Sequence, residues 1–338
     1  MINYEMKNIL VIKNLYVSYK TFVGIARAVN NLNLNIKRGE SLGLVGETVA
    51  DAPLQKSTIM KLLPPRTGRI DQGKVFFDGV DLTEKSDKYL QKIRGNKISM
   101  VFQNPLTSLN PVFTIGEQIS MVFAEHYRVS QREAWKKAGE MLEVVGIPSW
   151  RVKEYPHQFS GGMRQRVGIA AALACRPSLL IADEPTTALD VTIQAQFLEL
   201  LKDLKRQYKT SLIMISHNLG VIADICQSVA VMYAGSIIEY GSKDQVFRHP
   251  YHPYTKGLFA SLPKIHEKKE RLNAMKGVVS DALKLPEGCK FNPRCPCVIE
   301  KCKKNIPELT KIEMNHYVAC FKKTETGNKE VDRTTARS

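Results

Sequence analysis

Two adjacent acidic residues, Asp183 and Glu184, directly follow a short apolar run at residues 179–182. Such a run predicts a buried strand, and ligands of open α/β sheets bind at the carboxyl ends of the strands. The first carboxylate suits a Mg²⁺ ion shared with nucleotide phosphates, and the second can orient or deprotonate an attacking water. A strand that ends in a helix cap would show the same pair, but the PTTALD sequence at 185–190 argues against that interpretation.

A serine and two glycines, Ser160, Gly161 and Gly162, stand where a helix is predicted to begin. Backbone N–H groups and the positive end of that helix would face outward and form an anion site. A lone Ser-Gly-Gly is weak evidence for such a site. Its position shortly before the acidic pair favours a phosphate-binding function.

The loop after Gly46 departs from the usual phosphate-binding pattern. The apolar run at 41–45 predicts a strand that leads into this loop. In the motif G-x-x-x-x-G-K-[ST], backbone N–H groups wrap the phosphates while the lysine reaches them, so the spacing matters. Counted from Gly46, the lysine should stand at position 52, where the chain has Ala52. The nearest Lys-Ser-Thr stands four residues later, at 56–58.

Two alignments fit this spacing. In the first, the loop is four residues longer, the Lys-Ser-Thr at 56–58 still binds phosphate, and the next helix is about one turn shorter. In the second, the length from Gly46 through IMKLLP is kept and residues 49–58 are substituted. We favour the second, because Asp51 and Pro53 make a plausible helix start. No lysine then lies in the loop, Asp51 repels phosphate and Pro53 lacks an N–H.

The elements that must position these groups alternate between strands and helices. Apolar or β-rich runs predict strands at 9–17, 32–36, 41–45, 74–77, 97–102, 179–182 and 211–216. Helical spacing of apolar residues predicts a helical insert from 114 to about 145 and helices at 162–174 and 194–208. This alternation predicts a parallel sheet covered by helices.

The composition excludes several classes of protein. The chain has 338 residues, 43% of them hydrophobic, which suits a large core with an appendage. We find no apolar stretch of the roughly 20 residues that span a bilayer and no signal-peptide apolar region, so we expect a cytoplasmic protein that only partners hold at a membrane. The net charge is +16, but no basic amphipathic helix or aromatic-interleaved basic stripe supports nucleic-acid binding.

Five of the seven cysteines cluster between residues 289 and 320. In a cytoplasmic protein, such a cluster suggests metal or iron–sulfur ligation rather than disulfides. The spacing of Cys289, Cys295, Cys302 and Cys320 fits neither a zinc knuckle nor a bacterial ferredoxin run. Zinc and metal-free thiols therefore stay open as alternatives, with Cys297 as a fifth candidate ligand.

Taken in order, FSGGMRQR at 159–166 and LLIADEPTTALD at 179–190 resemble the signature motif and the Walker B strand of ABC-transporter ATPases. The resemblance implies a catalytic group of Glu184, His217 and Gln103. It implies a nucleotide site of Tyr19, Gly46, Lys56, Ser57, Thr58 and Asp183, with Asp183 and Gln103 on Mg²⁺. It implies a signature group of Ser160, Gly161, Gly162 and Gln165, and a D-loop residue, Asp190.

Longer segments narrow the resemblance to peptide-permease ATPases. They are NPLTSLNPVFTIGEQI, YPHQFSGGM, HPYHPYTKGLFASLP and GCKFNPRCPCVIEKC, and the resemblance covers residues from about 8 to 322. It implies an α/β fold: a RecA-like P-loop NTPase core with an antiparallel β subdomain, a helical subdomain and a small cysteine-rich extension. We expect an ATPase domain at 8–260 with its helical subdomain at about 114–175. The extension follows at 261–322, with a polar, disordered tail at 323–338.

The resemblance also implies cofactors and partners. The cofactors are ATP, Mg²⁺ and a [4Fe–4S] cluster on Cys289, Cys295, Cys302 and Cys320. The partners are a second ATPase subunit, two membrane permeases and an extracytoplasmic peptide-binding protein, at the cytoplasmic face of the membrane. Each nucleotide would lie between one chain's phosphate loop and the other chain's signature motif, and hydrolysis would drive uptake of dipeptides or oligopeptides.

Three rival functions remain. A nickel importer would use the same architecture with another cargo, and the cysteine extension favours peptides. A regulatory subunit that does not hydrolyse ATP is favoured by the altered phosphate loop. An ATPase of nucleic-acid repair or translation would usually carry two such domains or a long coiled-coil insert, and the chain shows neither.

Overall fold

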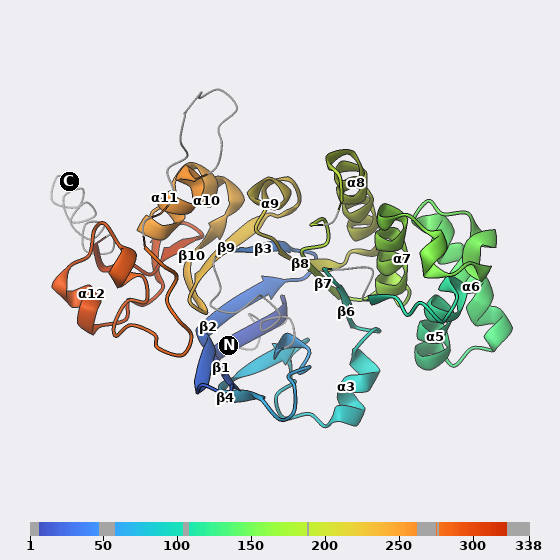
Figure 1. Cartoon of the computed structure of the whole chain (residues 1–338), viewed down its shortest axis with the longest axis horizontal. Coiled ribbons are helices and arrows are strands. Elements are labelled where there is room, and N and C mark those ends of the chain that lie inside the picture. Colours follow the sequence, from blue (N-terminus) through green and yellow to red (C-terminus); the bar gives the residue numbers. More distant parts are fainter. Residues whose placement is uncertain are drawn as a thin grey trace. The chain divides into compact units, whose positions relative to one another are not determined.

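The computed structural model describes residues 7–46, 58–103, 108–187, 189–261, 275 and 277–322. The chain forms two compact units (Figure 1). Unit 1 takes its described residues from 1–11, 35–42 and 76–225, and unit 2 from 12–34, 43–75 and 226–338. Lys56, Ser57 and the predicted tail at 323–338 lie outside the described residues.

The strands form two sheets. The smaller has the order β2-β1-β4-β5, and the larger has the order β11-β12-β10-β9-β3-β8-β7-β6. The strands of the smaller sheet are β1 (Asn8–Lys20), β2 (Ile25–Lys37), β4 (Gly68–Phe77) and β5 (Val80–Asp81). The predicted strand at 32–36 is therefore the second half of β2, and the one at 74–77 is the end of β4.

Unit 1 is built around parallel strands whose carboxyl ends carry the predicted acids. β6 (Ile98–Val101), β7 (Leu179–Asp183) and β8 (Ser211–Ile215) pair in parallel, with Ile98 opposite Leu179 and Asp183 opposite Ile215. All five residues of β7 are buried. The parallel pairing of these strands confirms the expectation from the βα alternation for this part of the sheet, whereas β9 to β12 pair antiparallel.

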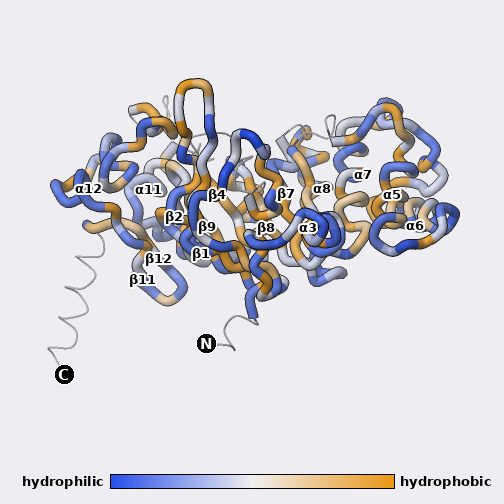
Figure 2. The backbone as a smooth tube through the Cα atoms, turned by 90° about the horizontal axis from the view of Figure 1, so that it is seen from below, coloured by the Kyte–Doolittle hydropathy of each residue, from blue (hydrophilic) through white to orange (hydrophobic). Residues whose placement is uncertain are grey.

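Five helices of unit 1 begin at side-chain caps: α3 (Asp87–Ile93), α5 (Ile115–Tyr127), α6 (Gln131–Val144), α7 (Gly161–Leu173) and α8 (Val191–Tyr208). The unit also contains α9 (Leu219–Ile225) and the short 3-10 helices η1 (Ser149–Lys153) and η2 (Pro156–Gln158). Thr114 and Glu117 form a capping box at α5, which satisfies N–H groups that the first turn leaves unpaired. Figure 2 shows α5, α6 and α7 side by side, each with hydrophobic and hydrophilic residues.

Unit 2 contains the antiparallel part of the larger sheet. β9 (Ser228–Tyr233) pairs with β10 (Ser236–Ser242), and β10 pairs with β12 (His316–Val318). On its other edge, β12 pairs with β11 (Thr310–Glu313). β3 (Ser41–Val45) is the buried strand predicted before Gly46. The remaining helices are α10 (Lys243–Arg248), α11 (Pro253–Ala260), η3 (Asn292–Arg294) and α12 (Glu300–Lys304).

A buried carboxylate, Glu239 on β10, joins two segments of unit 2. Its Oε1 accepts the N–H of Tyr251 at 2.7 Å, and its Oε2 accepts the N–H of His252 at 2.9 Å. Nε2 of His316 on β12 lies 2.9 Å from Oε1. His252 in turn accepts the N–H of Tyr254 on Nδ1 and caps α11. The buried carboxylate therefore has hydrogen-bond partners on both segments, as a buried charge requires.

Acid is expected to destabilise the protein through His252. Burial lowers the pKa of this imidazole to about 4, from 6.5. As the pH falls below 6.5, His252 binds a proton in the unfolded chain but stays neutral in the folded chain until the pH approaches 4. The free energy of unfolding therefore decreases between pH 6.5 and 4. The loss between pH 7 and pH 5 should be about 2 kcal/mol. Urea unfolding at both pH values measures it.

His252→Asn is the matched control for this prediction. Its side-chain oxygen can still accept the N–H of residue 254, but it does not titrate in this range. The variant should lose less stability between pH 7 and pH 5 than the parent chain. An equal loss in both proteins would assign the acid sensitivity to other groups.

Candidate nucleotide site

The Glu184 carboxylate gathers three side chains at the end of β7. Its Oε1 lies 2.6 Å from Nδ1 of His217. Its Oε2 accepts hydrogen bonds from Nε2 of Gln103 at 2.9 Å and from Oγ1 of Thr187 at 3.1 Å. Gln103 follows β6 and His217 follows β8, so the groups come from the carboxyl ends of three adjacent parallel strands. The catalytic group predicted from the motifs is thus brought together.

The backbone of Glu184 is held in an uncommon conformation. Its φ is +42°, in the left-handed region that residues with a side chain rarely adopt and that concentrates at functional sites. Its N–H donates to the carbonyl of Ile215 at 2.8 Å, which ties the acid to the end of β8. Asp183, the residue before it, is 1% exposed. The two carboxylates are therefore fixed by the sheet.

The contact with Glu184 also defines the proton on His217. An ionised carboxylate only accepts hydrogen bonds, so Nδ1 carries the hydrogen in the neutral imidazole. Nε2 is then the acceptor nitrogen and takes no part in this contact. The His217 side chain is 68% exposed, whereas that of Glu184 is 18% exposed. This arrangement suits an imidazole that meets a ligand from solvent while it orients the acid.

Thr187 is a site residue that the motif analysis missed. Its N–H donates to the Glu184 carbonyl at 3.3 Å, which forms a turn, and its hydroxyl reaches back to the carboxylate. The signal was present in the sequence, because a threonine three residues after an acid at a strand end can fold back in this way.

Gly46 must be a glycine for two reasons. Its φ is +122°, and a Cβ there would lie 2.1 Å from the carbonyl oxygen of Met232 on β9. Thr58, the last residue of the displaced Lys-Ser-Thr, is buried. Lys56 and Ser57 lie outside the described residues, so both alignments of the loop stay predictions.

Tyr19, a predicted residue of the nucleotide site, lies near the end of β1. Its ring packs beside Gly68, where an added Cβ would come within 3.2 Å of its Cε1. Burial raises the pKa of its hydroxyl above the usual value. The aromatic ring is half-buried, and its role toward a nucleotide stays a prediction.

The signature residues open α7 as the sequence predicts. Ser160 is the N-cap, and its hydroxyl accepts the N–H of Met163 at 3.3 Å. A Cβ added at Gly161 would meet nothing within 4 Å, whereas one added at Gly162 would lie 2.5 Å from Cγ2 of Ile193 on α8. Gly161 therefore borders open space, and Gly162 permits α7 to pack against α8.

Two residues that the motifs place in this region, Gln165 and Asp190, have structural positions within the chain. Gln165 is 1% exposed, and its amide nitrogen has no hydrogen-bond partner among the residues that the structure describes. It lies on the buried face of α7, one turn before Ile169 and two turns before Ala172. Asp190 caps α8 by accepting the N–H of Ile193 at 2.9 Å. The expected contact of Gln165 with a partner's nucleotide and the D-loop role of Asp190 stay predictions.

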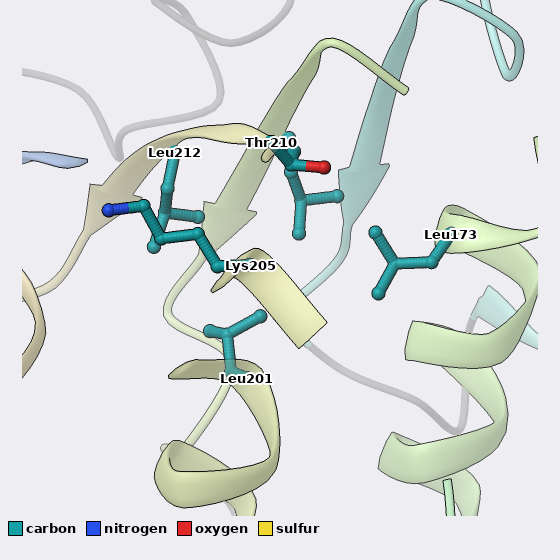
Figure 3. Close-up of a pocket in the computed structure, with 6 residues that line it drawn as sticks. Leu173, Leu201, Lys205, Thr210 and Leu212 are labelled. Carbon is teal, nitrogen blue, oxygen red and sulfur yellow. The ribbon is translucent and has the colours of Figure 1, made fainter. Parts of the chain in front are cut away.

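A small pocket lies between the sheet and the helices of unit 1 (Figure 3). It leaves no room for a water molecule, so it is a packing gap and not a ligand site. In Figure 3, Leu173 from α7 and Leu201 from α8 point into the same space. The full lining is Leu173, Leu180, Leu201, Lys205, Thr210 and Leu212.

The cysteines of unit 2 form no disulfide within the described residues, and their surroundings range from partly buried to buried. Burial, with smaller contributions from the nearby Cys302, Cys295 and Cys320, raises the pKa of Cys289 to about 11. The N–H of Cys289 also donates to the carbonyl of Cys302 at 2.8 Å. Within the described part of the chain, no three His, Cys, Asp or Glu side chains are close enough together to hold a single metal ion.

The comparisons with solved structures define the class of protein. The dimeric structure of the ATP-binding cassette MJ0796 bound to ADP and Pi matches 69% of this chain and 98% of that chain, with a TM-score of 0.60 and 30% identity. The structure of cbiO1 from Clostridium perfringens matches 72% of this chain and 92% of that one, with a TM-score of 0.59 and 26% identity. Together with the site, they define an ATP-binding cassette.

The sequence comparisons identify the family. The ABC transporter model matches residues 29–187, and the model of the oligopeptide/dipeptide transporter C-terminal region matches 238–302. The oligopeptide transport ATP-binding protein OppD of Bacillus subtilis is 46% identical over 93% of this chain and 88% of its own length. DppD of the same organism, a dipeptide transport ATP-binding protein, is 44% identical over 94% and 95%. The chain belongs to the oligopeptide/dipeptide transport group of the ABC transporter family.

No helix in the described part of the chain is long and apolar enough to cross a membrane.

Proposed function

We propose that this chain is the ATP-binding subunit of an importer that carries dipeptides or oligopeptides across the cytoplasmic membrane. The observation that carries the proposal is the Glu184 carboxylate, which Gln103, Thr187 and His217 hold at the end of β7. The match of residues 238–302 to the C-terminal region of oligopeptide/dipeptide transporters supports peptides over nickel as the cargo.

The proposed chemistry is the attack of water on the terminal phosphate of ATP. Glu184 would accept the proton of that water or orient it, and Gln103 and His217 would hold the carboxylate in place. Asp183, buried at the strand end, and Gln103 have the oxygen donors that Mg²⁺ prefers. When bound there, the ion would neutralise negative charge on the phosphates.

We propose that the chain works as a head-to-tail pair with a second ATPase subunit. The exposed start of α7 supplies backbone N–H groups and the positive end of a helix, which suit the phosphates of a nucleotide held by the partner. Two permeases and an extracytoplasmic peptide-binding protein would complete the transporter. The proposed position is peripheral, on the cytoplasmic face of the membrane.

The chain's own nucleotide site is proposed to be the weaker of the two. Under the favoured alignment, no lysine lies in the phosphate loop after Gly46. Phosphate contacts from lysine and N–H groups are charge-assisted and contribute roughly 1.5–3 kcal/mol each. The loss of several would weaken ATP binding by orders of magnitude. A subunit that regulates without hydrolysing ATP is the second candidate function, and this same loop favours it.

Glu184→Gln is expected to change ATP turnover by less than about threefold in the assembled transporter, because hydrolysis occurs mainly at the partner's site. The matched control is the corresponding substitution in the partner, where loss of the base should cost about 100-fold or more. Peptide-stimulated phosphate release from the reconstituted complex measures both effects. If no peptide stimulates turnover, the cargo assignment fails.

A different result would support the longer phosphate loop. If Glu184→Gln abolished turnover and Lys56→Ala weakened ATP binding at this site, then Lys56, Ser57 and Thr58 would bind phosphate. The favoured alignment and the assignment of hydrolysis to the partner's site would both be wrong.

We further propose that Cys289, Cys295, Cys302 and Cys320 hold a [4Fe–4S] cluster with a structural role. Four thiols are the donor set that such clusters use, and a cluster of several irons needs them more widely spaced than a single ion does. The backbone bond between Cys289 and Cys302, and their position in the matched C-terminal region, support the proposal. The proposed domain limits are 8–260, 261–322 and 323–338.

A further inference from the structure

Arg151, in the short helix η1, forms an ion pair next to the first residue of α5. The Arg151 and Glu154 side chains are only 18% and 20% exposed. Nε of Arg151 donates to Oε2 of Glu154 at 2.7 Å, and Nη2 lies 2.6 Å from the same oxygen. The carbonyl of Glu154 accepts the N–H of Ile115, the first residue of α5, at 2.9 Å. The arginine is therefore fixed by a partly buried ion pair on a helix start.

The other donors of Arg151 reach the segment that leads into α7. Nη2 donates to the carbonyl of Gln158 at 3.2 Å, and Nη1 lies 3.5 Å from the sulfur of Met163. The guanidinium carbon lies 4.3 Å from the centre of the buried Phe159 ring. One planar group thus contacts residues on both sides of Ser160.

A second arginine holds the same segment from the helix side. Nε of Arg164 on α7 donates to the carbonyl of Pro156 at 2.7 Å. The carbonyls of Pro156 and Gln158 in this turn are therefore each bonded to an arginine. Ser160 caps α7 directly after the turn, so the orientation of the turn sets the orientation of the cap.

We propose that Arg151 is a positioning residue for the signature helix. It fixes the direction in which Ser160 and the first N–H groups of α7 point. The inference rests on the proposed function, in which this end of α7 meets the nucleotide held by the partner. Arginine suits the task because its five N–H donors lie in one plane whose face stacks on an aromatic ring, whereas lysine has one compact charge.

Hydrogen exchange of the purified full-length chain, without nucleotide or partner, tests the positioning directly. In Arg151→Ala and in Arg151→Lys, amides of residues 157–164 should exchange about tenfold faster, because this segment opens locally more often. Amides of α8 should keep their rates. Arg132→Ala, at an exposed arginine of α6, removes the same charge without these contacts and should change neither region.

Steady-state hydrolysis by the assembled transporter tests the consequence. In Arg151→Ala, kcat should fall about tenfold or more, because small misplacements of groups that act at the reacting centre are costly. KM for ATP should change less than about twofold, because the partner's own loop binds the nucleotide before the signature helix meets it. Arg151→Lys should recover at most part of kcat.

The outcomes separate this inference from the proposed function. Unchanged exchange at 157–164 in Arg151→Ala would overturn it. So would faster exchange spread over all of unit 1, or full recovery of both measurements by lysine. A parent complex without ATPase activity would count against the proposed function, while the exchange result would still decide the role of Arg151.

Discussion

Replacing Ser160 by arginine is expected to abolish ATP hydrolysis by the assembled transporter. The serine hydroxyl caps α7 by accepting the N–H of Met163, and a Cβ added at the next residue would meet nothing within 4 Å. An arginine there removes the cap and fills the space in which the partner's nucleotide is proposed to lie. Loss of an N-cap costs only about 1 kcal/mol, so the chain should still fold.

Phosphate release by the reconstituted complex measures this effect, and turnover should fall at least about 100-fold, as when a group stabilising the transition state is removed. Ser160→Thr is the control, because threonine also caps helices, and it should keep most of the activity. ATP binding to the open complex should be unchanged in both variants. Activity of Ser160→Arg within a few-fold of the parent would refute the composite site.

The second large effect concerns the cysteines of unit 2. Anaerobically purified protein is expected to contain iron and labile sulfide and to show broad visible absorption. Cys289→Ser should remove all three signals. The hydroxyl of serine is a poor substitute for a thiolate ligand of iron. Serine replacement of Cys295, Cys302 or Cys320 should have the same result.

Cys297→Ser is the matched control for the cluster. Cys297 lies two residues from Cys295 and is partly exposed like it, but it is not among the four proposed ligands. Its replacement should leave most of the iron and the absorption in place. Stoichiometric zinc without sulfide in the parent protein would contradict the iron–sulfur assignment and support one of the simpler alternatives.

The parts of the fold with strong local patterns could be predicted from the sequence. β7 is a continuous apolar run that is buried throughout, and α7 begins at the serine that caps it. β2 was predicted only from 32 to 36, although it begins at Ile25, because asparagines interrupt its apolar residues. β12 was missed, because its three residues form a strand only by pairing with β10, for example Val318 with Glu239.

The candidate site was predictable as a set of residues but not as a geometry. Motif order named Gln103, Glu184 and His217, and the parallel strands bring them within hydrogen-bond distance. Thr187 was missed because its hydroxyl reaches Glu184 only through the backbone turn in which its N–H donates to the Glu184 carbonyl. Gln165 was grouped with the signature residues, yet its side chain is buried. The sequence alone could not show this, because it does not reveal which side of α7 packs against the rest of the protein.

The absent side chain at Gly162 has a mechanical consequence. The signature serine caps α7. Asp190 caps α8 and stands six residues after the acid that is proposed to act on the chain's own nucleotide. At Gly162 the two helices touch with no room for even a methyl group, so they cannot slide past each other at this point. Because packed helices move together, a displacement of the start of α7 is expected to be passed on to the start of α8 at this contact.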